Sequence, residues 1–172
     1  MRTIRLHGRV ACFVGAVALL GQISPALASD DNHNNRPVEI SFTKWGAPPP
    51  AAPPTPFFGL FEGFAGDGLL GSFVAEVLWR QTSVNGHVSG LEAMYEVVDG
   101  DRSFTALIRG GQNAAGAAHF DGVILTGWRA GARVQVVYQR YLANATMPSC
   151  EGAPVNKTCF VGTIYVDRAP KD

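Results

Sequence analysis

The chain has 172 residues, with 14 basic and 14 acidic side chains and a formal net charge of zero. Because charge is balanced and sparse, there is no basic surface of the kind that binds nucleic acid, and we expect no nucleic-acid partner. The length beyond the first 28 residues suits one domain, and twenty glycines spread along the chain are typical of short strands joined by tight turns.

The first 28 residues have the three parts of a secretory signal peptide. Three arginines precede or border the apolar run VACFVGAVALL (residues 10–20), and Ala26-Leu27-Ala28 offers the small residues that a signal peptidase needs. The run is too short for a membrane span of about 20 residues, and Pro25 follows it. We therefore expect cleavage after Ala28, a secreted or periplasmic protein, and no membrane span in the mature chain.

Residues 29–56 form a polar and proline-rich segment. Its beginning, SDDNHNNRP, has nothing to bury, and GAPPPAAPPTP (residues 46–56) must run extended because proline fixes φ and removes a backbone donor. Between them, VEISFTKW (residues 38–45) alternates apolar and polar side chains and predicts one short strand. We expect this segment to precede a separate barrel domain that covers residues 57–172.

The stretch FFGLFEGFAGDGLLG (residues 57–71) mixes aromatic side chains with glycines. Glycines in such a segment permit bends or a close approach of two backbones. A phosphate-binding loop is disfavoured because no Gly-Lys-Ser/Thr is present and Asp67 would repel a phosphate. We expect no cofactor here or elsewhere.

From residue 72 onward the chain reads as an antiparallel meander. Turn signals at Asn85-Gly86 and Asp99-Gly100 separate segments that alternate apolar and polar residues, namely 72–81, 91–98, 103–110, 118–125, 133–142 and 159–167. The large apolar residues of one face are Phe73, Trp79, Tyr95, Phe104, Phe120 and Tyr138. The pattern predicts an all-β fold: a single small antiparallel β-barrel of about seven or eight strands, or alternatively a β-sandwich.

Two cysteines, Cys150 and Cys159, remain once the signal peptide with Cys12 is removed. An even number of cysteines in an exported chain predicts a disulfide. A zinc site would need two more ligands, and no Cys-x-x-Cys or close histidine pair lies nearby, so we expect no metal.

The strand pattern also carries a resemblance. The segments HFDGVILTGW (residues 119–128), GARVQVVYQRY (131–141) and CFVGTIYVD (159–167) resemble those of small secreted bacterial β-proteins without an assigned activity. At the level of topology, residues 57–166 are similar to the allene-oxide-cyclase and dirigent type of barrel. No catalytic residue of those families falls on a matching position here, so the resemblance implies a fold and no site.

The second face of the predicted strands is polar, with Glu76, Arg80, Glu92, Glu96, Arg109, His119 and Asp121. Because both signs of charge occur where cross-strand pairs meet, we interpret this face as a solvated exterior with ion pairs worth about 0–1 kcal/mol each. In the alternative, the polar face lines a cavity. His119 with Asp121, Glu92 or Glu76 would then serve as the general acid and base of a small cofactor-free cyclase or isomerase.

The separation of His119 and Asp121 bears on that alternative. Residues two apart on a strand lie about 6–7 Å apart, so we expect these two not to form a hydrogen bond easily. A glutamate on a neighbouring strand would be the better partner for the imidazole.

The sequence therefore predicts an exported, disulfide-stapled β-barrel that is a binding or structural module rather than an enzyme. Its partner would be a small apolar molecule or another protein, and an oligomer is left open. The enzyme alternative differs in one testable point, which is the face of the strands that lies inside.

Overall fold

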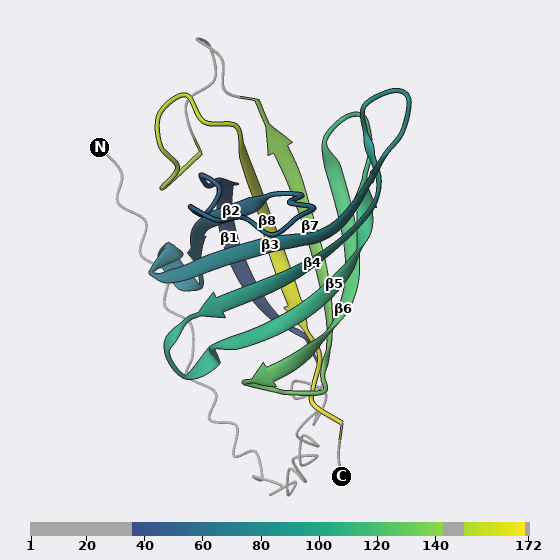
Figure 1. The fold of residues 1–172 in the computed structure, drawn as a ribbon. Helices are drawn as coiled ribbons and strands as arrows, with labels where there is room; N and C mark the ends of the chain where they lie inside the picture. The colour runs from purple at the N-terminus through teal and green to yellow at the C-terminus, as the bar shows by residue number, and fades with distance from the viewer. Residues whose placement is uncertain (1–35, 143–149, 171–172) are drawn as a thin grey trace, which may run out of the picture. The chain divides into compact units, whose positions relative to one another are not determined.

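A computed structural model describes residues 36–142 and 150–170. The expected signal peptide and nearly all of the polar leader lie outside these residues. Eight antiparallel strands follow one another around a closed barrel (Figure 1). They are β1 (Val38–Gly46), β2 (Leu60–Ala65), β3 (Gly71–Thr82), β4 (Val88–Val98), β5 (Phe104–Gln112), β6 (Ala117–Gly127), β7 (Arg133–Tyr141) and β8 (Cys159–Val166). The all-β prediction and the single small antiparallel barrel are confirmed, and the sandwich alternative is not what the chain forms.

The barrel closes between its first and last strands. Phe42 of β1 lies opposite Ala65 of β2 on one side and opposite Gly162 of β8 on the other. The expected domain boundary at residue 57 was therefore wrong, because the strand at residues 38–46 is one of the eight strands of the barrel and pairs on both edges. Without it, the edges of β2 and β8 would be left unpaired.

The proline-rich stretch is a loop between neighbouring strands and not a spacer ahead of the barrel. It connects the end of β1 to the start of β2. The backbone N–H of Ala47, just after β1, donates to the carbonyl oxygen of Leu60, the first residue of β2, at 2.9 Å. The N–H of Val77 in β3 donates to the carbonyl oxygen of Gly59 at the same distance, which ties the end of the loop to the barrel wall.

Alternation of side chains decides what fills the barrel. Successive residues of a strand point to opposite faces, so every second side chain of each strand points into the barrel. The predicted interior face is confirmed for Phe73, Tyr95, Phe104, Phe120 and Tyr138, all of which are buried. Aromatic rings pack against one another within this core: Phe73 and Tyr95 meet edge to face with 4.8 Å between ring centroids, and Phe120 and Tyr138 stack at 5.5 Å.

Trp79 departs from the predicted face. The register between β3 and β4 shifts between Val77 and Trp79, so one extra residue on β3 turns the indole outward, where it is 48% exposed. The ring then lies over Gly90 of β4, where a Cβ would come within 2.8 Å of the indole. Strict alternation along the strand predicted a buried tryptophan. The prediction was wrong at this position because the sequence gives no clear sign of the bulge that shifts the alternation.

Strand β2 was not predicted as a strand, since Gly63 interrupts its apolar pattern. The glycine is required there, because a Cβ at this position would lie 1.9 Å from the carbonyl oxygen of Thr43 on β1. The backbones of β1 and β2 thus approach each other at a point where no other residue fits. This is the close approach that the glycine-rich stretch predicted.

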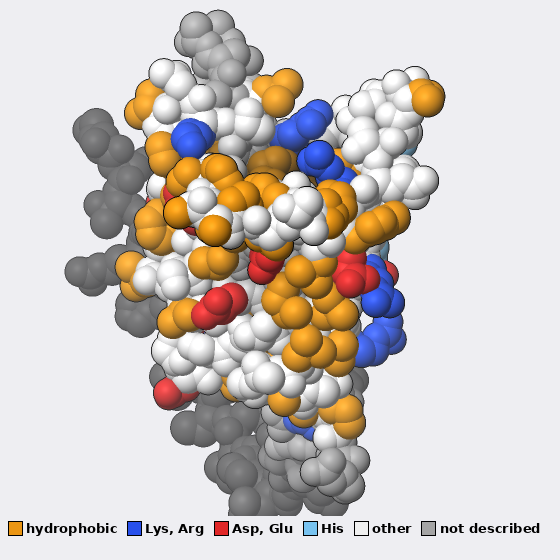
Figure 2. Space-filling view, in the orientation of Figure 1, with side chains coloured by type: hydrophobic (Ala, Val, Ile, Leu, Met, Phe, Trp, Pro, Cys, Tyr) orange, Lys and Arg blue, Asp and Glu red, His pale blue; other side chains and the backbone are white. Residues whose placement is uncertain are grey.

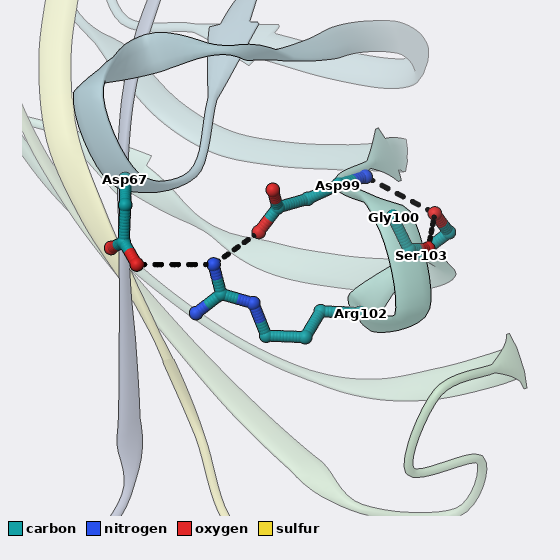
Figure 3. A network of polar contacts seen from close by, with 5 residues as sticks. All are labelled: Asp67, Asp99, Gly100, Arg102 and Ser103. Carbon is teal, nitrogen blue, oxygen red and sulfur yellow. Dashed lines mark hydrogen bonds and ion pairs between the residues drawn. The ribbon is translucent and has the colours of Figure 1, made fainter.

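A polar network joins two connections between strands (Figure 3). The 3-10 helix η2 (Asp67–Leu69) links β2 to β3, and η3 (Gly100–Arg102) links β4 to β5. One guanidinium nitrogen of Arg102 lies 2.7 Å from a carboxylate oxygen of Asp99 and 3.3 Å from one of Asp67. The hydroxyl of Ser103 accepts from the N–H of Asp99 and donates to the carbonyl oxygen of Gly100. These contacts hold the two connections together.

The predicted disulfide is present. Cys150 is bonded to Cys159, the first residue of β8, and their Cα atoms are 6.3 Å apart. The bond fastens the segment that precedes β8 to the start of the strand that closes the barrel.

Candidate functional site

The interior of the barrel contains a lysine. The inward-facing positions of β1 include Ile40, Phe42 and Lys44, and Lys44 is only 4% exposed. Among the residues that the structure describes, it is the one Lys, Arg, Asp or Glu that is buried. Because moving a charge out of water is costly, such a residue in an otherwise apolar core needs an explanation.

Six aromatic rings surround the lysine, and we refer to them together as the aromatic cage. Their centroids lie between 4.6 and 5.7 Å from Nζ, and they belong to Phe42, Phe61, Phe73, Tyr95, Tyr138 and Phe160. At this distance the electron-rich faces of the rings attract a cation. Nζ also donates a hydrogen bond of 2.5 Å to the hydroxyl oxygen of Tyr95.

The cage changes the protonation of the amine. Burial lowers the pKa of Lys44 from 10.5 to about 7, because the charged form loses its hydration. Burial likewise raises the pKa of Tyr95 well above its usual value, with a smaller contribution from Tyr138, whose own pKa burial also raises. Near neutral pH the cage therefore holds two neutral phenols and an amine that loses its proton far more readily than an exposed lysine does.

The lysine lies near one end of the barrel. The next inward position on β1 is Gly46, where a Cβ would meet no atom within 4 Å. Phe61 and Phe160 lie beside that position as a T-shaped pair, with 5.4 Å between ring centroids, and both are only partly buried. The cage thus reaches the surface at this end, behind two aromatic rings and an open glycine position.

The histidine and aspartate predicted as candidates lie on the outer face. The side chains of His119 and Asp121 on β6 are 59% and 57% exposed, and Gln135 of β7 donates to the aspartate at 3.2 Å. The imidazole Nε2 is 3.4 Å from a carboxylate oxygen of Asp121, a distance at which the two side chains attract each other when the imidazole is protonated. The two side chains lean toward each other and span the separation of their backbones.

The two candidate glutamates are also on the outside. Glu92 of β4 lies opposite Arg109 of β5, and 2.5 Å separates its carboxylate oxygen from Nε of the arginine. The two form a cross-strand ion pair of the kind expected on the polar face. Glu76 is exposed on β3. On the face that Figure 2 shows, acidic and basic side chains lie on the surface beside a patch of hydrophobic ones. The interior is apolar around Lys44, and the polar interior that the cyclase or isomerase alternative needs is not present among the described residues.

Sequence reasoning missed Lys44, although a signal for it exists. The strand pattern that places Ile40 and Phe42 inward places Lys44 on the same face. A lysine at the end of a strand is usually interpreted as solvated, and only the closure of β1 against β8 shows that this position is enclosed.

A groove lies on the outside of the barrel beside the disulfide. Its volume is about 530 Å³. It lies next to β1, η2, the end of β7 and the start of β8, and its lining includes Ser41, Thr43, Leu69, Tyr141, Cys150, Glu151 and Val161. Thr43 points outward from β1 yet is buried, which shows how closely this side of the barrel is covered.

Within residues 36–142 and 150–170, no cluster of three histidine, cysteine or acidic side chains could hold a metal ion. Over the same ranges, the chain has no helix with the length and apolar character that crossing a bilayer requires. No family model matches the sequence, and no curated protein or solved structure matches it at a significant level. The function is therefore argued from the geometry of this barrel alone.

Proposed function

We propose that the protein is an exported, disulfide-stapled β-barrel that binds a small apolar molecule in the groove outside β1 and is not an enzyme. The observation that carries the proposal is the contrast between the two sides of the barrel wall. Aromatic side chains pack the interior, whereas the outer groove provides about 530 Å³ of space.

The groove has the size and composition of a ligand site. Small-molecule sites have volumes of about 300–1,000 Å³ and combine apolar walls with a few polar groups. Leu69, Tyr141 and Val161 supply apolar surface here, while Thr43 and Glu151 offer oxygen atoms. These features favour a mainly apolar ligand that carries one hydrogen-bonding group.

The disulfide supports both the site and the export. Cys150 lines the groove and is bonded to Cys159, so this wall of the groove is covalently fixed to β8. Disulfides persist in oxidising compartments, which agrees with the signal peptide that the sequence predicts. Mass spectrometry of the protein secreted by an expression host tests the export directly, with a mature chain beginning at Ser29 as the expected result.

Titration with Nile red, an uncharged apolar dye, tests the groove. We expect saturable binding at one site, monitored by the increase in dye fluorescence, and loss of that binding in V161D, which places a charge in the groove. The matched control is L125D, which changes an exposed apolar residue of similar size on β6. Equal loss in both variants, or no saturation in the unmodified protein, would contradict a groove site.

A further inference from the structure

We propose that Lys44 captures small apolar aldehydes covalently, as an imine held within the aromatic cage at the open end of the barrel. This site is separate from the groove outside β1 and does not depend on it. Three observations support it: a buried amine, a hydroxyl in contact with that amine, and an unfilled position at Gly46, two residues further along β1.

The amine has the chemistry that the first step needs. A neutral amine attacks a carbonyl carbon, whereas an ammonium has no free electron pair, and burial favours the neutral form of Lys44 by lowering its pKa to about 7. When nitrogen attacks, the C–N bond forms and the electrons of the C=O bond move to oxygen. That oxygen takes up a proton from the nitrogen and gives a carbinolamine.

Tyr95 is placed to assist the loss of water. Its hydroxyl lies 2.5 Å from Nζ and is kept in the protonated form by burial. It donates its proton to the departing hydroxyl of the carbinolamine as the C–O bond breaks, and it recovers a proton from the nitrogen. The balance is one aldehyde and one amine converted to one imine and one water, with no oxidant or reductant required.

The surroundings select the class of aldehyde. The six rings of the cage offer apolar contact to a hydrocarbon tail, and within residues 36–142 and 150–170 no carboxylate or guanidinium contacts Nζ. Two cations lie around the cage: Arg140 of β7 acts on Tyr138, and the amine of Lys157 donates to the carbonyl oxygen of Gly46. A protonated imine is a cation, and the same rings that attract the ammonium stabilise it. Aldehydes that carry a charged tail would lose hydration without gaining a partner.

Entry is restricted to small molecules. The cage is closed by the edge-to-face pair of Phe61 and Phe160, while Gly46 leaves the side of the mouth along β1 open. We expect a short linear aldehyde to pass between Gly46 and the two rings, beside the exposed amine of Lys157, which donates to the carbonyl oxygen of Gly46 at 3.2 Å. A bulky one would require the pair to separate.

Reductive labelling with butanal tests the proposal. The full sequence has three lysines, Lys44, Lys157 and Lys171, so peptide mapping by mass spectrometry distinguishes every amine side chain. Folded protein is incubated with butanal and cyanoborohydride at pH 7, and hydride transfer to the imine carbon fixes the adduct as a secondary amine. We expect Lys44 to be modified at least ten times faster than Lys157, which is exposed.

Two variants make the result specific. G46F fills the open position of the mouth, and we expect it to slow the modification of Lys44 several-fold while Lys171 reacts as before; Lys157 is not the reference here, because its amine donates to the carbonyl oxygen of Gly46. Y95F removes the hydroxyl, and we expect slower imine formation with the cage intact. Labelling of Lys44 should also level off above about pH 7.

The outcomes that overturn the proposal are equally definite. If Lys44 reacts no faster than Lys157, or reacts only in urea, the amine is inaccessible to carbonyl compounds in the folded protein and the proposal is wrong. An unchanged rate in G46F would show that the aldehyde does not enter past Gly46. Neither outcome bears on Nile red binding, which reports on the outer groove.

Discussion

Replacing Lys44 with methionine should make the barrel more stable at neutral and acidic pH and remove a large part of its pH dependence. Lowering the pKa from 10.5 to about 7 corresponds to about 5 kcal/mol, at about 1.4 kcal/mol for each pH unit. Between about pH 7 and pH 10.5, Lys44 is protonated in the unfolded chain and uncharged in the folded barrel. The unfolded state therefore binds one proton more, and the free energy of unfolding rises with pH over this range. Below about pH 7 both states are protonated, and the full cost of burying the ammonium remains.

Urea unfolding followed by tryptophan fluorescence measures this effect between pH 6 and 9.5. Relative to K44M, the unmodified protein should gain about 3 kcal/mol between pH 7 and 9.5, because the lysine no longer has to be buried as a cation. Between pH 6 and 7 the difference between the two proteins should change little. Methionine keeps the length and apolar packing of the lysine stem, so no cavity is expected in the variant.

The control for this experiment is K157M, which removes an exposed lysine whose amine donates to the carbonyl oxygen of Gly46. Its pH profile should follow that of the unmodified protein. A constant difference between the unmodified protein and K44M across the whole range would refute the reasoning, since it would show that Lys44 is buried with its proton or is hydrated in the folded state.

Three further predictions concern stability. Cys159→Ser should lower the free energy of unfolding by about 2–3 kcal/mol in urea, and a reducing agent should produce the same loss in the unmodified protein. Gly63→Ala should cost about 3 kcal/mol or more, because its Cβ would overlap a main-chain oxygen of β1. Gly46→Ala should stay within about 0.5 kcal/mol, and equal losses at the two glycines would contradict the packing described. A double-mutant cycle on Glu92 and Arg109 should give a coupling of about 0.2–1 kcal/mol that salt weakens, whereas a salt-independent coupling would show that the pair is shielded from solvent.

Most of the fold could be predicted because strands with one buried face have a strong period of two. Seven of the eight strands follow from this alternation, and the residues expected inside are those found there apart from Trp79. The exceptions have local causes. In β2 a glycine replaces an inward apolar residue because two backbones nearly touch, and in β3 a bulge shifts the alternation by one position.

The site could not be predicted in the same way. The outer position of His119 and Asp121 follows from the polar face, but their mutual contact depends on side-chain conformations that strand geometry leaves free. The role of Lys44 depends on long-range closure, since Tyr95 on β4 and Phe160 on β8 are 51 and 116 positions further along the chain. A pattern confined to one strand cannot show that residues so far apart in the chain enclose the same amine.

The strand order has a consequence for how the chain folds. Every strand except the first and the last has its two sheet neighbours next to it in sequence, so each hairpin can form as soon as its own residues are available. The pairing of β1 with β8 is the one step that joins distant parts of the chain, and steps of that kind are slow. If the protein is exported from its N-terminus, β1 emerges first and its outer edge stays open until the last strand arrives. Sequence changes that delay β8 should therefore appear as aggregation during synthesis rather than as a less stable folded protein.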